Sequence, residues 1–256
     1  MYHNLTVFFF FFATILQNDF SPSIADLLAL PSSLAPPDFP PCASQIYCSG
    51  ELLHAIQTAR IFNDSKTFVD MPLRFPPEQV LANYATLPPG ASADQLRVFL
   101  EQNFLSAGSE LQVLEPPDWV EDPPFLEMIE NPETQAWAKD VHGRWKQLYR
   151  KFDHTISCAE CFSSIALPKA FVVPGGRFRE PYYWDTYWAV KGLLVSGMRD
   201  TVRGMIDNFV YMVNSIGFVP NGSRIYYLNR SQPPFLVGSR INSCCLWQPQ
   251  QQPQKN

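Results

Sequence analysis

Pro-Gly-Gly-Arg-Phe-Arg-Glu-Pro-Tyr-Tyr-Trp-Asp-Thr-Tyr-Trp, residues 174 to 188, crowds glycines, aromatic rings and charges of both signs into one short stretch. The two glycines, which lack a Cβ, predict a tight turn at its start. Carboxylates and guanidinium groups bond hydroxyls, while aromatic faces pack against the C–H side of a sugar ring. The mixture therefore suits a ligand rich in hydroxyls, and a sugar better than a nucleotide. The alternative is a helix start with a core-facing aromatic stripe.

A second polar and aromatic cluster, Pro220-Asn-Gly-Ser-Arg-Ile-Tyr-Tyr-Leu-Asn-Arg-Ser-Gln-Pro-Pro-Phe235, lies further along the chain. Its Pro-Asn-Gly start predicts a turn. Arg224, Arg230, Ser231 and Gln232 are candidate donors to hydroxyl groups. A surface loop is the alternative, but two loops of this composition are expected to form two walls of one polar pocket.

Helical spacing of apolar residues dominates the rest of the chain. Ser65 to Leu73 is predicted to be extended, Gly108 to end the helix that Ser92 caps, and residues 171–173 and 225–228 to be short strands. Trp137, Val141, Trp145 and Leu148 recur at helical spacing, which favours a core-facing stripe. The fold class is thus all-α, built from paired helices with long loops. The predicted helices cover residues 49–62, a short stretch from 77, 92–105, a stretch from 131, 184–197 and 198–216.

Composition and charge limit the function. The chain has 256 residues, 46% of them apolar, and a net charge of −5 without a long basic run, which argues against nucleic acid as a partner. Residues 5–16 form an apolar run too short to span a bilayer but typical of a signal-peptide core, with a buried strand as the alternative. We expect a signal peptide over 1–20, a Pro-rich linker over 21–41, a folded part over 42–235 and a disordered tail over 236–256.

The six cysteines fall in three close pairs. Cys42 and Cys48 flank a short loop and are placed to bridge in an oxidising compartment. Cys158 and Cys161 have redox or zinc spacing, but without a flanking His pair a disulfide or two free thiols is favoured over zinc. Cys244-Cys245 lies in the tail. Acceptor patterns for glycosylation occur at Asn63, Asn221 and Asn229.

Several of these segments resemble motifs of the trehalase family. Pro174–Tyr187 resembles its first motif almost letter for letter, and Val219–Pro234 resembles its second substrate loop. The segments Cys48-Ser-Gly-Glu-Leu-Leu53 and Asp64-Ser-Lys-Thr-Phe-Val-Asp-Met71 resemble the N-terminal part of secreted animal members. The resemblance covers about residues 42 to 235.

This resemblance implies an (α/α)₆ toroid, of which the chain holds the N-terminal part. It implies hydrolysis of α,α-trehalose to glucose with inversion, trehalose or glucose as the ligand, and no metal or organic cofactor. The apolar run at residues 5–16 predicts a secreted protein with no obligate membrane partner, anchored only if the signal stays uncleaved. The residues implied to bind substrate are Arg177, Phe178, Tyr182, Trp184, Asp185, Asn221, Arg230, Ser231 and Gln232.

The sequence departs from the family pattern after Phe235. The segments that carry the family's general acid and base are expected downstream and are not found, while Glu180 and Asp185 match a structural and a binding carboxylate. We therefore expect a chain that is inactive alone, or a sugar-binding or regulatory fragment, or one that never folds stably. An incomplete toroid leaves apolar helix faces bare, which favours self-association. A glycan is expected on Asn63 and not on Asn221 or Asn229, because a glycan on either would block the substrate pocket if these residues line it.

Overall fold

The computed structural model describes residues 42–235. The predicted signal peptide, the linker, the tail and Cys244-Cys245 lie outside this range. Within it, no helix has the length and apolar character needed to cross a membrane.

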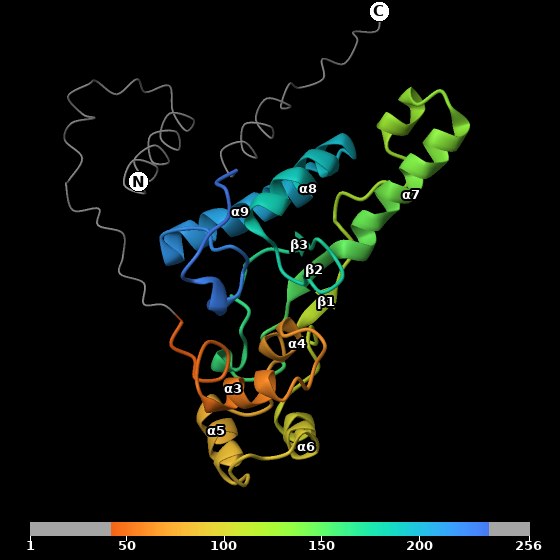
Figure 1. Ribbon diagram of the computed structural model, residues 1–256. Helices are drawn as coiled ribbons and strands as arrows, with labels where there is room; N and C mark the ends of the chain where they lie inside the picture. Colours follow the sequence, from red (N-terminus) through yellow and green to blue (C-terminus); the bar gives the residue numbers. More distant parts are fainter. Residues whose placement is uncertain (1–41, 236–256) are drawn as a thin grey trace, which may run out of the picture. The chain divides into compact units, whose positions relative to one another are not determined.

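Residues 42–235 are mostly helical, as predicted, with seven α-helices and three short strands (Figure 1). The α-helices are α3 (Glu51–Thr58), α4 (Lys66–Val69), α5 (Pro77–Ala85), α6 (Ala93–Asn103), α7 (Pro132–Leu148), α8 (Tyr183–Val195) and α9 (Arg199–Ile216). The strands are β1 (Leu111–Val113), β2 (Tyr149–Phe152) and β3 (Phe171–Val172), and the 3-10 turns are η1 (Pro124–Met128), η2 (Ala159–Cys161) and η3 (Ile225–Tyr227).

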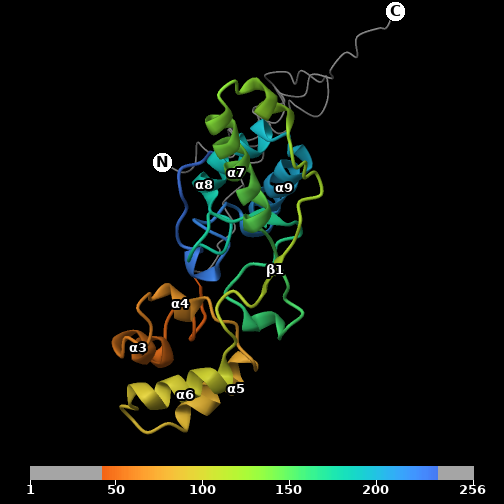
Figure 2. The ribbon, with the colours of Figure 1, turned by 90° about the vertical axis from the view of Figure 1, so that its right-hand side faces the viewer.

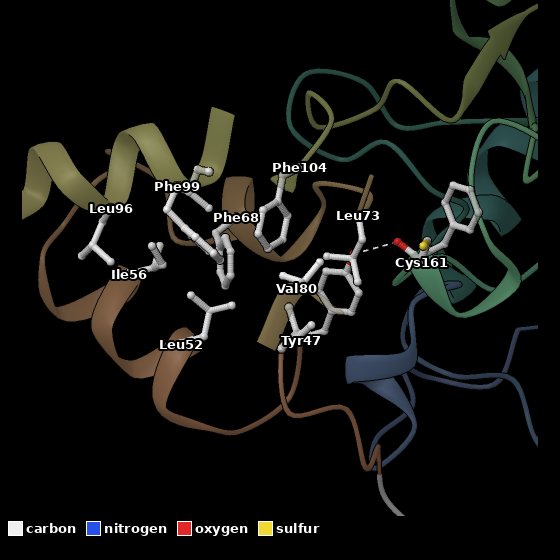
Figure 3. Close-up of a cluster of buried hydrophobic side chains, with 13 residues drawn as sticks. Tyr47, Leu52, Ile56, Phe68, Leu73, Val80, Leu96, Phe99, Phe104 and Cys161 are labelled. Atoms are coloured by element: carbon white, nitrogen blue, oxygen red, sulfur yellow. Dashed lines mark hydrogen bonds between the residues drawn. The ribbon is translucent and has the colours of Figure 1, made fainter. Parts of the chain in front are cut away.

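Helices α3 to α6 share one apolar core, shown in Figure 3. The predicted inward residues of α6, Leu96, Phe99 and Leu100, are buried there. Phe68 and Phe104 meet with ring centroids 5.3 Å apart. The periodicity argument is thus confirmed for this part of the chain.

Two predictions in this region are wrong. Residues 66–69 form a helical turn rather than an extended segment, because the Asp64 carboxylate accepts the Lys66 N–H and Lys66 pairs with Asp70 one turn later. Helix α6 does start at the Ser92 capping box, but it ends at Asn103 and not at Gly108. Phe104 leaves the helix because its extended backbone bridges Leu73.

The three strands form one antiparallel sheet in the order β1-β2-β3. Leu111 pairs with Phe152, and Tyr149 pairs with Val172. The strand predicted at 171–173 is confirmed, whereas residues 225–228 form the turn η3 instead. Strands β1 and β2 pair with each other about 40 residues apart in the chain, so no local pattern predicts them.

Helix α7 begins at the Asn131 cap as predicted, but its tryptophan stripe is not a core. Trp137 is 67% exposed, and Val141 is exposed as well. The residue that α7 buries is His142. Trp145 is the only tryptophan of the stripe with a partner here, since its indole N–H donates to Ser196 at the end of α8. Spacing gives a face of a helix, but not what covers that face.

Helices α8 and α9 pack against each other, as Figures 1 and 2 show. Gly197, at φ 78°, makes the turn between them. Tyr183 of α8 meets Phe209 of α9 edge-on at 5.5 Å. The inward face of α9 includes Val202, Met205, Ile206, Phe209 and Met212, which are buried. This pair of helices supports the loops that carry the candidate site.

Candidate sugar-binding site

The turn before α8 forms as its glycines require. Gly175 and Gly176 adopt φ values of 109° and 59°, and Gly175 bridges Phe178. The turn directs Arg177 toward the loop before α4, where its Nη1 lies 2.7 Å from Asp64 Oδ1. This hydrogen bond lowers the pKa of the Asp64 carboxyl. The Arg177 side chain is therefore exposed and is also held in position by Asp64.

An aromatic line continues from this turn into the second loop. Phe178 meets Tyr182 edge-on at 5.4 Å, and Tyr182 meets Tyr227 at 5.8 Å. The two tyrosine hydroxyls are 3.1 Å apart. The Arg230 guanidinium lies over the Tyr227 ring, 4.9 Å from its centroid. Both arginines of the predicted site thus sit at the ends of one row of rings.

The two loops are joined by their main chains. Tyr182 bridges Gly222, the Tyr183 N–H donates to the Asn221 carbonyl at 3.2 Å, and the Asn221 N–H donates to the Arg230 carbonyl at 2.9 Å. A Cβ on Gly222 would lie 3.2 Å from Tyr182 Cε1 and 3.1 Å from Tyr227 Cε2. The absence of a side chain there allows the close approach of the two loops.

The first turn of α8 completes the site. The main-chain N–H of Trp184 donates to Gln232 Oε1 at 3.0 Å, and Gln232 Nε2 lies 3.4 Å from Asp185 Oδ2. Ser231 is turned to the other side and donates to the Val219 carbonyl at 2.7 Å. The Trp184 indole is 42% exposed and stacks loosely on Phe235, at 6.5 Å. The nine predicted residues are brought together by these contacts, although the hydroxyl of Ser231 is already engaged.

Beneath the site lies a buried ionic cluster of Lys66, Asp70, Glu110, Glu180 and Arg224. Arg224 Nε lies 3.2 Å from Glu180 Oε2, and Lys66 Nζ lies 2.9 Å from Glu180 Oε1. Arg224 is 1% exposed, so the prediction that it donates to a ligand hydroxyl is wrong. Its Nε donates to Glu180 Oε2 at 3.2 Å, and its Nη1 donates to Ser163 Oγ at 3.0 Å.

The charges of this cluster shift the pKa values of Glu180 and of the neighbouring Tyr182. Burial would raise the pKa of Glu180, but Arg224 and Lys66 outweigh burial and lower it. Burial and the Glu180 charge raise the pKa of Tyr182, whose hydroxyl donates to Glu180. Glu180 is therefore an ionised structural carboxylate, and Tyr182 is a fixed neutral wall.

Glu110 differs from the other carboxylates. Its Oε1 lies 2.9 Å from Arg224 Nη1, yet neither of its oxygens receives a hydrogen bond. Burial, only partly offset by Arg224, raises the pKa of its carboxyl. The distance supports an ion pair by proximity, without the directed bonds that would favour full ionisation.

Sequence reasoning missed four residues that support the site: Asp64, Lys66, Asp70 and Glu110. The first three lie in the segment Asp64–Met71, whose charged residues were given no role. The i,i+4 spacing of Lys66 and Asp70 could have indicated an ion pair on one helical turn. Glu110 stands alone in the sequence, so nothing local marks it.

Arg177, Trp184 and Arg230 of the candidate site are exposed, whereas Asp185 and Asn221 are half-buried. The two described hollows, of about 690 and 430 Å³, lie elsewhere, one of them between α5 and α6, and neither includes a residue of the candidate site. Within residues 42–235, no three His, Cys, Asp or Glu side chains are grouped to hold a metal ion. The chemistry on offer is hydrogen bonding from guanidinium, amide and carboxylate groups beside flat apolar faces.

Comparison with known proteins identifies relatives of the chain. A family model described as Trehalase matches residues 60–243. Trehalase of Oryctolagus cuniculus is 49% identical over 203 residues, which are 77% of this chain and 35% of that protein. Trehalases of Homo sapiens and Dictyostelium discoideum are 47% and 49% identical over 77% of this chain, and over 35% and 34% of their own lengths. The chain spans about a third of the length of these curated relatives.

Proposed function

This chain belongs to the trehalase family, and from that premise we propose that residues 42–235 carry the sugar-recognition part of an α,α-trehalase. Such a glycosidase hydrolyses α,α-trehalose to glucose, here with inversion. One observation supports this most directly. The bridge between Tyr182 and Gly222 gathers two guanidinium groups, a carboxylate and several aromatic faces on one surface.

In this proposal each group has a role set by its chemistry. Arg177 and Arg230 donate to sugar hydroxyls, and Asp185 accepts from them. The exposed Trp184 indole packs on the C–H face of a glucose ring. The remaining contacts and walls are supplied by Phe178, Tyr182, Asn221, Ser231 and Gln232.

We further propose that the described part does not hydrolyse trehalose by itself. Inversion needs a general acid and a general base roughly 6.5–9.5 Å apart. Glu180 is fully buried and ion-paired on both oxygens, so neither water nor substrate reaches it. That leaves Asp185 as the carboxylate of the first segment that is open to a ligand. A sugar-binding or regulatory role without catalysis is the alternative, favoured by the same observation.

Binding is tested by calorimetry with trehalose and glucose on the full chain. Arg230→Gln removes an exposed donor and should weaken trehalose binding roughly 10- to 100-fold, since a hydrogen bond from a charged group contributes about 1.5–3 kcal/mol. Arg203→Gln on α9 is the matched control, because it removes an exposed arginine away from the site. Equal affinity of both variants, or no heat at millimolar sugar, would remove the proposal.

Catalysis is tested separately by glucose release from trehalose. We expect none above background for this chain, compared with a full-length relative. Release at the rate of that relative would show that the chain supplies its own acid and base, and would leave the binding result standing.

We also propose that the protein is secreted, with a signal peptide over 1–20, a linker over 21–41 and a tail over 236–256. The disulfides Cys42–Cys48 and Cys158–Cys161 support an oxidising compartment. Asn63 is exposed, whereas Asn221 is half-buried beside the site, which supports a glycan on Asn63 and not on Asn221. Glycopeptide mapping tests this, and a glycan on Asn221 would contradict the site assignment.

A further inference from the structure

The Cys158–Cys161 disulfide contains no residue of the candidate site. It links two cysteines three positions apart, across the turn η2. A cross-link over so short a loop removes little chain entropy from the unfolded state, so stability is a weak reason for its presence. The two sulfurs also have different surroundings. Cys158 is half-buried and is followed by the exposed residues Ala159 and Glu160, whereas Cys161 is fully buried.

The buried sulfur already faces a partner suited to its reduced form. Cys161 Sγ lies 3.2 Å from the main-chain carbonyl oxygen of Phe75. A disulfide sulfur carries no hydrogen to donate to that oxygen, whereas a thiol does. Reduction therefore allows Cys161 to donate a hydrogen bond to this oxygen.

The surrounding main chain does not depend on the sulfur bridge. The Cys161 carbonyl oxygen accepts from the Leu73 N–H and from the Tyr47 hydroxyl, both at 2.9 Å (Figure 3). These bonds involve backbone and tyrosine atoms only. The fold around η2 is thus compatible with both the oxidised and the reduced pair.

We propose that Cys158–Cys161 is a thiol–disulfide exchange site that takes a dithiol as its reductant, with Cys158 as the sulfur attacked. One thiolate of the dithiol attacks Cys158 Sγ, which forms a mixed disulfide and breaks the bond to Cys161. The departing Cys161 thiolate takes a proton from solvent and donates it to the Phe75 carbonyl as a hydrogen bond. The second thiolate of the dithiol then attacks the reductant sulfur that is bonded to Cys158, and Cys158 leaves as a thiolate. Two electrons pass to the protein, and the dithiol leaves as a cyclic disulfide.

The first test uses the oxidised full chain and a monothiol, glutathione, which traps the mixed disulfide. Peptide mass mapping then gives the position of each adduct and separates η2 from the other cysteine pairs. We expect the adduct on Cys158 at least about tenfold more often than on Cys161, because the accessible sulfur is attacked. Equal adducts on both, or none before the protein unfolds, would overturn the proposal.

Single variants test the same asymmetry from the reduced side. Cys161→Ser leaves a lone thiol at 158, which glutathione disulfide should modify in the folded protein. Cys158→Ser leaves a lone thiol at 161, which should stay unmodified until denaturant is added. The Cys42–Cys48 pair is the control in each case, since both of its sulfurs are half-buried and should give no such preference. Rapid modification of Cys161 in the folded Cys158→Ser protein would contradict the assigned direction of attack, and the wild-type mapping decides the matter if a variant does not fold.

Discussion

Glu180 and Glu110 approach the same guanidinium, that of Arg224, in opposite ways. Glu180 is bonded to Arg224 and Lys66, whereas Glu110 lies beside Arg224 without a hydrogen bond. The cluster contains two cations, Lys66 and Arg224, and three carboxyls. A proton on Glu110 would balance these charges, in agreement with the raised pKa of that group.

Glutamine substitutions separate the two carboxyls. Glu180→Gln should lower the free energy of unfolding by about 3–5 kcal/mol, because it leaves two buried cations with one fewer partner. Glu110→Gln keeps the shape of a carboxyl group that receives no hydrogen bond, so its cost should be about 1 kcal/mol or less. Urea unfolding at neutral pH measures both. Equal losses would contradict the asymmetry described here.

The same pair predicts opposite dependence on pH. The pKa of Glu180 is lowered in the folded state, so its contribution is present above the usual value of 4.5 and is lost as the pH falls. The pKa of Glu110 is raised, so its contribution is present below 4.5 and is lost as the pH rises through the folded-state pKa. Relative to wild type, Glu110→Gln should therefore gain stability as the pH rises above 4.5. A difference between wild type and variant that stays constant from pH 4 to 8 would refute this.

Gly222 sets the distance between the two loops of the site. Gly222→Ala places a methyl group against the rings of Tyr182 and Tyr227, which should cost about 1–3 kcal/mol and weaken sugar binding. Gly143→Ala is the matched control, since a Cβ there meets nothing within 4 Å and alanine favours the interior of α7. Thermal unfolding and calorimetry report the two effects. Unchanged affinity in Gly222→Ala would separate this residue from the site.

At the level of elements, α6 is the helix whose start is best defined. Ser92 Oγ accepts the Gln95 N–H, and Gln95 Oε1 accepts the Ser92 N–H at 2.8 Å. Ser92→Ala should lower the free energy of unfolding, measured in urea, by about 0.5–2 kcal/mol. The Gln95 N–H loses its acceptor, and the reciprocal bond from the Ser92 N–H to the Gln95 side chain is weakened. Ser92→Thr keeps the hydroxyl and should retain most of the stability. A loss in Ser92→Thr as large as in Ser92→Ala would point to packing and not to capping.

The elements that could be predicted from the sequence are those with local causes. The Ser92 cap, the Asn131-Pro132 start and the apolar face of α9 lie within one or two turns of the chain. The strands β1 and β2 and the burial of Arg224 depend on partners far away in sequence. The nine site residues came from motifs of the trehalase family and stay a prediction, while the ionic cluster under them required the three-dimensional structure.

For the whole molecule, apolar residues of α7 and α8 remain exposed within residues 42–235. Trp137 and Val141 on α7, and Trp188 and Val195 on α8, are all exposed. The family assignment agrees with a mostly helical chain that forms part of a helical toroid. Exposed apolar side chains that lie on one face of a helix favour association when they form a patch.

We therefore expect self-association that depends on protein concentration. Sedimentation velocity of the full chain should show it, and the double variant Trp137→Gln/Trp188→Gln should reduce it. Val113→Thr is the control, because Val113 is an exposed apolar residue of β1 outside these helices. A monomer at all concentrations would exclude the idea.

The hydrogen bond from the Tyr226 hydroxyl to Asp70 joins residues 156 positions apart. A chain leaves the ribosome from its N-terminus at roughly 5–20 residues per second, so Asp70 and Lys66 emerge about 8–30 seconds before Arg224 and Tyr226. During that interval Lys66 and Asp70 can pair with each other and interact with water, but the Arg224 guanidinium is not yet present. The paired loops can assemble only after residue 230 has been synthesised and has emerged, so within residues 42–235 they gain protection from proteases late in synthesis.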